Sequence, residues 1–233
     1  MITEKLRSIL HASGAVLIGF ADMHDIVASI LPYAACVAIP IPVNIVQEIE
    51  EGPTLAYWDT CNTLNAKLNE IITHGAEYLQ SLGYAAIPVT TGYAQQDKQR
   101  RTPLPYKTVA TRAGVGWIGK SCLLVTPEYG SAIRMSTLLT DAPLQCGTPI
   151  KHSKCGKCEL CKKHCPADAL TDNFWHEDIE REQLFNVEAC VDIIKKRMKE
   201  RTGIEATLCG KCFVVCPHTR KYIREATSIK MPL

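Results

Sequence analysis

The chain has 233 residues, a formal net charge of +2 at pH 7, and 46% hydrophobic residues. This length and composition are typical of a folded globular protein with one large or two smaller domains, and they argue against an intrinsically disordered chain. A net charge so close to zero gives no general attraction to nucleic acid or to anionic membranes, so such a partner would need a local basic patch.

The N-terminal part of the chain alternates between helical and strand-like patterns. Apolar residues at helical spacing predict a helix over Thr3–Ala12 and a long amphipathic helix over Thr54–Leu82. Uninterrupted apolar runs at Ala15–Phe20 and Ala34–Ile39 predict central strands that are covered on both faces. The first of these runs is too short to span a bilayer, so we expect no membrane segment there.

A long polar loop over residues 91–105 follows a short predicted strand at Ala85–Val89. Long loops in compact domains often carry function, although a basic loop such as this one is usually only solvated. The candidates for a proton donor to a substrate, all of them residue types that are more often structural, are Tyr93, Asp97 and Tyr106.

A glycine-rich stretch, Gly114-Val-Gly-Trp-Ile-Gly-Lys-Ser121, follows a short helix predicted at Val109–Ala113. It satisfies the Walker A expression, but a phosphate-binding loop leads from a strand into a helix, whereas this stretch leads from a helix into an apolar strand. We therefore do not expect ATP to bind there. Because glycines allow close approach of a ligand, and Trp117 and Lys120 add a flat apolar face and a charge, we expect an anionic or macrocyclic cofactor.

The chain then changes character near Gln145. An apolar strand at Leu123–Val125, a turn at Pro127–Gly130 and an apolar run at Met135–Leu139 predict a hairpin. Beyond it the composition shifts abruptly toward cysteine and lysine. We therefore predict two domains, an α/β domain over residues 1–145 and a cysteine-rich, ferredoxin-like domain over residues 146–233.

The cysteine-rich part opens with the run Cys155-Gly-Lys-Cys158-Glu-Leu-Cys161-Lys-Lys-His-Cys165-Pro. Three thiolates spaced by two residues let one loop bind a corner of a [4Fe–4S] cluster, while the fourth cysteine, followed by proline, ligates a different cluster. This single run therefore predicts two clusters.

A second half-motif lies downstream as Cys209-Gly-Lys-Cys212-Phe-Val-Val-Cys216-Pro. It lacks only its first cysteine, which Cys190 can supply. The cross-over rule then predicts two complete sites. Cluster A would be held by Cys155, Cys158, Cys161 and Cys216, and cluster B by Cys165, Cys190, Cys209 and Cys212.

Other uses of these cysteines fit their spacing less well. Zinc sites accept pairs of cysteines two residues apart, but they do not call for three such cysteines followed by Cys-Pro, given twice. A disulfide framework is not needed by a chain long enough to bury a core. Cluster thiolates would be at risk in an oxidising compartment, so we expect a cytoplasmic protein.

Together, the glycine stretch, the cysteine run, the lone cysteine and the second half-motif resemble the epoxyqueuosine reductase family and its relatives, the reductive dehalogenases. The resemblance covers about residues 105–220. It implies a nitroreductase-like N-terminal sheet with flanking helices that binds cobalamin, followed by two [4Fe–4S] clusters that pass electrons to the cobalt. The cobalamin contacts that it implies are Gly114, Gly116, Trp117, Gly119 and Lys120.

Two departures from the family pattern concern the substrate. In epoxyqueuosine reductases a catalytic aspartate precedes the glycine stretch, but residues 99–106 contain no acid here, and Asp97 is out of register. The helical-repeat extension of many family members also has no counterpart after the second half-motif. On these grounds we expect neither tRNA modification nor a nucleic-acid partner.

The leading hypothesis is an iron–sulfur oxidoreductase that takes electrons from an external ferredoxin or flavodoxin. It would pass them through both clusters to a bound corrinoid, which reduces a small or nucleoside-type substrate. Two alternatives stay open: an electron-transfer protein without catalysis of its own that docks a partner, and a flavin-dependent reductase. Cofactor content separates the three.

Overall fold

The computed structural model describes residues 1–26, 28–92 and 96–228. The chain divides into two compact units, each assembled from stretches that are distant in sequence. The first, here called the sheet unit, comprises residues 1–40, 63–116 and 134–150; the second, the cysteine unit, comprises residues 41–62, 117–133 and 151 onward. The domain boundary near Gln145 stays a prediction.

A four-stranded sheet in the order β1, β2, β6, β3 forms the centre of the sheet unit. β1 pairs with β2, and β3 with β6, in antiparallel register. The fold is therefore of the mixed α/β kind, and the three predicted strands before residue 90 are confirmed. β1 lies at an edge of the sheet, however, and not at its centre. The strands are β1 (Leu17–Asp22), β2 (Tyr33–Pro40), β3 (Ala86–Val89) and β6 (Ile133–Thr140).

The predicted hairpin is wrong. Its first strand pairs instead with the end of the glycine stretch, as β4 (Trp117–Ile118) with β5 (Leu124–Val125). Its second strand belongs to β6, which lies between β2 and β3. The reason is burial: β6 is largely buried, and its Thr137 hydroxyl donates to the Ala35 carbonyl of β2. A sheet of distant strands covers such a strand, whereas a small hairpin would leave it exposed.

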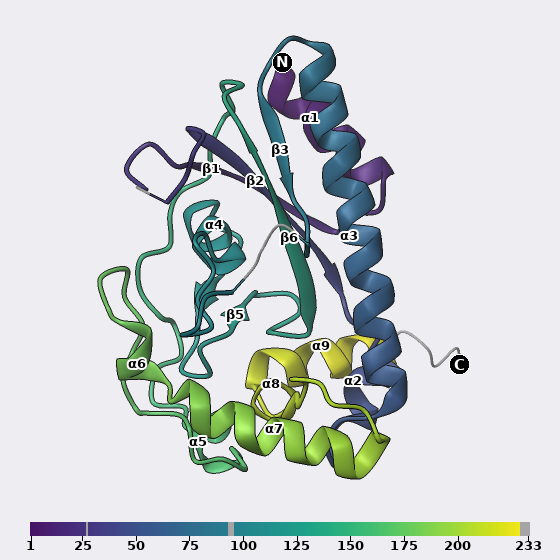
Figure 1. Cartoon of the computed structure of the whole chain (residues 1–233), viewed down its shortest axis with the longest axis vertical. Coiled ribbons are helices and arrows are strands. Elements are labelled where there is room, and N and C mark those ends of the chain that lie inside the picture. Colours follow the sequence, from purple (N-terminus) through teal and green to yellow (C-terminus); the bar gives the residue numbers. More distant parts are fainter. Residues whose placement is uncertain (27, 93–95, 229–233) are drawn as a thin grey trace. The chain divides into compact units, whose positions relative to one another are not determined.

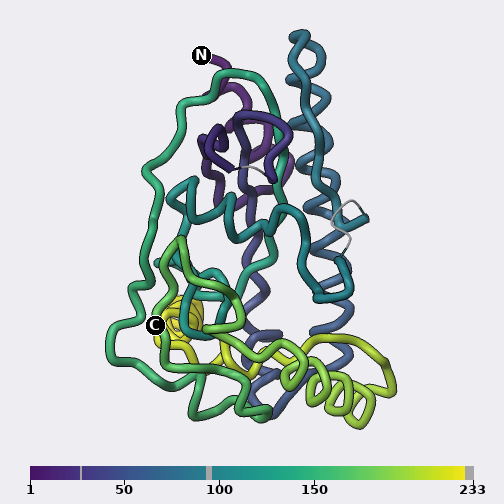
Figure 2. Tube along the Cα trace, turned by 60° about the vertical axis from the view of Figure 1, so that its left-hand side comes forward, coloured from purple at the N-terminus to yellow at the C-terminus, as the bar shows by residue number. Residues whose placement is uncertain are grey.

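Helices α1 (Ile2–Ala12) and α3 (Leu55–Ser81) pack on one face of the sheet (Figure 1). Both confirm predictions from apolar spacing, and α3 is one uninterrupted helix (Figure 2). The Thr54 hydroxyl caps α3 by accepting the backbone N–H of Tyr57. Fully buried apolar side chains from these helices and strands form the core: Leu6, Leu10, Phe20, Val37, Leu68, Ile71, Ile72, Leu79 and Leu138.

A third helix, α4 (Tyr106–Arg112), packs against β1 and β2. Phe20 of β1 belongs to the core with α1 and α3, and successive side chains of a strand alternate, so Gly19 faces the opposite way. A Cβ at Gly19 would lie 2.6 Å from Val115 Cγ2, so only glycine permits this close packing. Gly114 ends α4 with a φ of +73°, a conformation typical of a helix C-terminus.

The cysteine unit contains short helices around the cysteine motifs. Its longest, α7 (Val187–Thr202), follows Asn186, whose side chain caps it by accepting the Ala189 N–H, and it buries Val191 and Met198. The others are α2 (Val43–Glu48), α5 (Leu160–Lys163), α6 (Arg181–Leu184), α8 (Lys211–Val214) and α9 (Pro217–Ser228). In the described part of the chain, no helix combines the length and the apolarity needed to cross a bilayer.

The core assignment predicts unequal effects of two leucine truncations. Leu138 is fully buried, whereas Leu82 is 48% exposed. Leu138→Ala is expected to lower the free energy of unfolding by about 2–5 kcal/mol because it leaves a cavity. Leu82→Ala should change it by less than about 0.5 kcal/mol. Urea unfolding followed by far-ultraviolet circular dichroism measures both, and equal effects would contradict the assignment of Leu138 to the core.

Candidate metal centre

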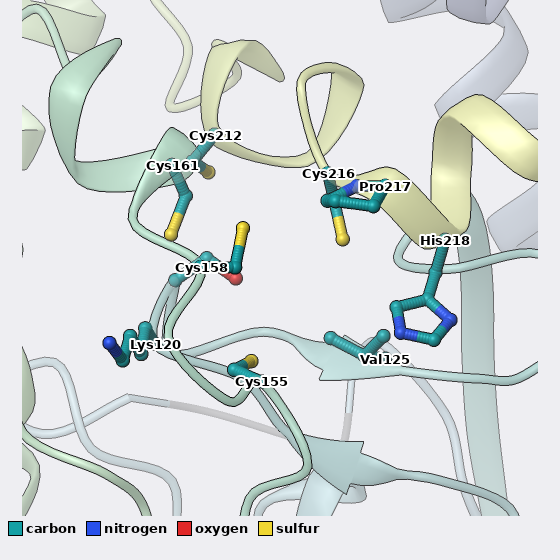
Figure 3. A pocket seen from close by; sticks show the side chains of 10 residues that line it. Lys120, Val125, Cys155, Cys158, Cys161, Cys212, Cys216, Pro217 and His218 are labelled. Carbon is teal, nitrogen blue, oxygen red and sulfur yellow. The ribbon is translucent and has the colours of Figure 1, made fainter.

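One cavity of about 180 Å³ in the cysteine unit is lined largely by cysteine thiols (Figure 3). All four cysteines predicted for cluster A line it, and Cys212, predicted for cluster B, lines it as well. The lining is completed by two apolar, one basic and two further polar residues: Val125, Pro217, Lys120, Ser121 and His218. Both cysteine motifs therefore meet at one place.

Local turns bring the cysteine run to the cavity. Gly156, with a φ of +54°, lets the chain turn between Cys155 and Cys158, and the Cys158 N–H donates to the Cys155 carbonyl. Cys161 follows in the short helix α5. The pKa of the Cys161 thiol is raised to about 11, mainly by burial and also by the neighbouring thiols of Cys155, Cys216 and Cys158.

Cys216 reaches the same cavity from the junction of α8 and α9. Pro217 is the first residue of α9, a position at which proline is well tolerated because its missing N–H is not needed. Burial raises the pKa of the Cys216 thiol, and the backbone N–H groups of His218 and Thr219, which donate to it, lower it in part. The start of α9 thus directs two donors at this sulfur.

The remaining four motif cysteines form a second group. The pKa of Cys190 is raised to about 11, mainly by burial and also by the thiols of Cys165 and Cys209. Burial likewise raises the pKa of Cys212, and Cys209 and Cys190 add to it. The thiol of Cys161 also raises the pKa of Cys212, so Cys212 lies close enough to both groups to interact with them electrostatically. The sulfur of Cys165 accepts the Ala169 N–H at 3.5 Å.

The donor set fits an iron–sulfur cluster. Buried thiols that raise one another's pKa favour a positively charged metal group between them, because metal binding replaces their protons. Among the described residues, no three His, Cys, Asp or Glu side chains lie close enough together to hold a single ion. The thiols instead surround a space large enough to hold several atoms.

The five residues that the resemblance assigns to cobalamin are divided between the units. Gly114 and Gly116 belong to the sheet unit, and a Cβ at Gly114 would lie 2.8 Å from the Thr148 carbonyl oxygen. In the cysteine unit, a Cβ at Gly119 would lie 3.3 Å from Cys155 Sγ. Gly114 and Gly119 are therefore explained by packing within the chain and do not by themselves define a corrinoid site.

The other two of the five are buried beside the cavity. Trp117, 3% exposed, meets the His218 ring edge to face at 4.9 Å, and its Nε1 has no acceptor in the described structure. Lys120 lies with its Nζ 4.5 Å from the centre of the Phe174 ring. His218 and Phe174 could not be identified from the cysteine spacing, because neither belongs to it. The corrinoid contacts stay predictions.

Two of the three predicted proton donors make hydrogen bonds with the backbone, and the third lies outside the described residues. Tyr93 is not among the described residues. The Asp97 carboxylate accepts the backbone N–H of Arg101 at 2.8 Å. The Tyr106 hydroxyl donates to the Val89 carbonyl at 2.9 Å, and burial raises its pKa. Neither Asp97 nor Tyr106 is among the residues that line the cavity.

Comparison with known families accounts for the cysteines. Residues 154–219 match the family model described as a 4Fe-4S double cluster binding domain, and this range contains all eight predicted cluster cysteines. The chain therefore carries a domain for two [4Fe–4S] clusters.

Comparison with individual proteins extends the likeness beyond this domain. An epoxyqueuosine reductase from Listeria monocytogenes is 34% identical over 119 residues, which are 48% of this chain and 29% of that protein. The chain resembles the epoxyqueuosine reductases. The matches span less than half the length of such curated relatives.

Two solved structures share the fold. A reductive dehalogenase, described in connection with B12-dependent dehalogenation, superposes with a TM-score of 0.75 at 20% identity, over 98% of this chain and 34% of that one. An epoxyqueuosine reductase bound to an epoxyqueuosine-modified tRNA stem loop gives a TM-score of 0.60 at 18% identity, over 93% of this chain and 65% of that one. Both likenesses concern the fold alone.

The close packing of Gly130 against Thr219, near Cys216, predicts that a substitution of Gly130 causes a selective loss of iron. Gly130 has a φ of +57°, and a Cβ there would lie 2.4 Å from the backbone nitrogen of Thr219. Gly130→Ala should therefore displace the start of α9 and with it Cys216. We expect iron after anaerobic reconstitution to fall to about half, since one of two four-iron clusters is lost.

A matched control is Gly203→Ala. Gly203 also has a left-handed φ, of +76°, but a Cβ there would meet nothing within 4 Å. Backbone strain is thus similar in the two variants, and only the collision differs. Full iron in Gly130→Ala, or the same loss in Gly203→Ala, would contradict this account of how Cys216 is placed.

Proposed function

We propose that this chain is an iron–sulfur oxidoreductase in which two [4Fe–4S] clusters carry electrons from an external donor to an acceptor. The observation that carries the proposal is that cysteines of both motifs line one cavity, and that one of them, Cys212, is also coupled electrostatically to Cys190 and Cys209. Two adjacent clusters form a path for single electrons, which isolated metal sites would not provide.

The ligand sets that we propose follow the cross-over between the motifs. Cluster A takes the first three cysteines of the run and the last cysteine of the second half-motif. Cluster B takes the last cysteine of the run, the lone cysteine and the first two cysteines of the second half-motif. Support comes from the cavity lining for cluster A and from mutual pKa effects for cluster B. The sets are Cys155, Cys158, Cys161 and Cys216 for cluster A, and Cys165, Cys190, Cys209 and Cys212 for cluster B.

The surrounding protein adjusts the clusters without taking part in bond breaking. Backbone N–H groups that donate to Cys216 and Cys165 stabilise negative charge on the sulfurs, which favours the reduced state of a cluster. Burial of the thiols limits access of water and oxidants. These effects set the reduction potentials and protect the electron path.

The partners are inferred from the resemblance. The donor would be a low-potential protein of the ferredoxin or flavodoxin type. The reductive dehalogenase fold supports a corrinoid as acceptor, in a sheet unit of nitroreductase-like form, and a bound corrinoid would supply the bond-breaking chemistry. The substrate would be small or nucleoside-like. A tRNA substrate, as the solved epoxyqueuosine reductase complex suggests, competes with our expectation that nucleic acid is not a partner.

A second candidate is an electron-transfer protein without catalysis of its own. One observation favours it: Asp97 and Tyr106 are committed to backbone hydrogen bonds, and residues 99–106 contain no acid that could donate a proton. In this case the acceptor would belong to a partner protein.

Cofactor content tests the proposal and separates the two candidates. The protein is reconstituted anaerobically with iron and sulfide, incubated with hydroxocobalamin and passed through a desalting column. About eight irons per chain support the two clusters. Cobalt retained at one per chain supports the corrinoid reductase, whereas iron without cobalt supports the electron-transfer protein. Stoichiometric zinc with little iron would contradict the proposed function.

The assignment of the lone cysteine predicts a clear difference between two serine variants. Cys190→Ser should lose about half of the iron, because cluster B would lack a ligand. Cys146→Ser, which changes an exposed cysteine of the sheet unit, should keep all of it. Iron analysis after identical reconstitution measures both. Full iron in the Cys190 variant would mean that another residue completes cluster B.

A further inference from the structure

Lys120 places a buried positive charge beside the proposed cluster A. The residue is 4% exposed, and its aliphatic stem lines the cavity together with Cys155 and Cys158, while its nitrogen is turned away from the sulfurs (Figure 3). Burying a charged side chain is unfavourable unless an opposite charge or a suitable polar group lies close by. A lysine buried in this cavity wall is therefore expected to interact with the group that the cavity holds.

The described residues offer Lys120 little compensation. The charge of Lys120 contributes to lowering the pKa of the Asp172 carboxylate. Asp172 is, however, already paired with Lys162 at 2.6 Å. The close partner of the ammonium is instead the Phe174 ring, whose centre lies 4.5 Å away. A cation over an aromatic face is stabilised only modestly, so a larger negative charge nearby would account better for the burial.

Phe174 also explains how the charge is kept from water. The ring is 48% exposed, so a large apolar surface faces solvent at this point of the segment between Cys165 and Cys190. Its inner face lies over Nζ of Lys120. Exclusion of water lowers the local screening, so a charge held in this way acts more strongly on its surroundings than an exposed lysine does.

A [4Fe–4S] cluster with four thiolate ligands is negatively charged, and reduction adds one further negative charge. We propose that Lys120, covered by Phe174, is a positioning residue that raises the reduction potential of cluster A. The inference rests on the proposed function, because it requires that the four thiols around this cavity hold a cluster. Cluster B has a different cation beside it, because Arg197 lowers the pKa of its ligand Cys209. The proposed effect of Lys120 therefore concerns cluster A alone.

The test is a redox titration followed by electron paramagnetic resonance on the anaerobically reconstituted full chain. Cys158→Ser first identifies which of the two one-electron steps belongs to cluster A. Lys120→Met should make that step at least about tenfold less favourable, which is about 59 mV more negative, and leave the other step unchanged. Lys120→Arg, which keeps the charge, should restore the original potential.

Lys157→Met is the matched control. Lys157 lies between Cys155 and Cys158 in sequence, but its side chain is exposed, so solvent screens its charge and its removal should have a much smaller effect. Phe174→Ala admits water to Lys120 and should shift the same step in the same direction by a smaller amount. This variant keeps the inference testable should Lys120→Met not assemble.

The outcomes separate the inference from the function on which it rests. If the wild-type chain binds no clusters, the proposed function itself fails. If both clusters form, the inference is overturned by an unchanged cluster A step in Lys120→Met or in Phe174→Ala, by an equal shift in Lys157→Met, or by movement of the cluster B step instead.

Discussion

The mutual repulsion of buried thiolates is the constraint on which the cysteine unit depends. Thiols such as Cys161, Cys190 and Cys212 are driven toward their neutral forms by burial and by one another. Iron supplies the positive charge that lets all of them ionise together. Folding of the cysteine unit and cluster loading are therefore coupled, because without metal the buried thiols are held in their neutral forms and cannot all ionise together.

Glycines hold the two motifs in the positions that this constraint requires. Gly119 allows Cys155 to lie close to the strand pair β4 and β5, and Gly130 allows the start of α9 to pack beneath Cys216. Gly210, between Cys209 and Cys212, has a φ of +81°, and a Cβ there would lie 2.5 Å from Ile49 Cδ1. Such contacts place sulfurs that come from distant parts of the sequence.

The cluster cysteines could be predicted from sequence because their spacing is itself the local geometry of a cluster loop. Helices α1 and α3 were equally predictable from their apolar periodicity. The pairing of β6 was not, because its partners lie far away in the chain and only burial selects them. Gly114 ends a helix, and Lys120 lies at the cysteine cavity; a motif alone could not distinguish these roles from cofactor contacts.

The central claim is that each of the two clusters takes ligands from both cysteine motifs. Anomalous diffraction at the iron edge, recorded from anaerobically grown crystals of the loaded protein, tests it most directly. The account predicts two separate iron peaks, one next to Cys216 and the thiols of the run, the other next to Cys165, Cys190 and the thiols of the second half-motif. A single iron peak, or Cys165 and Cys216 each bound to the cluster of its own motif, would contradict it.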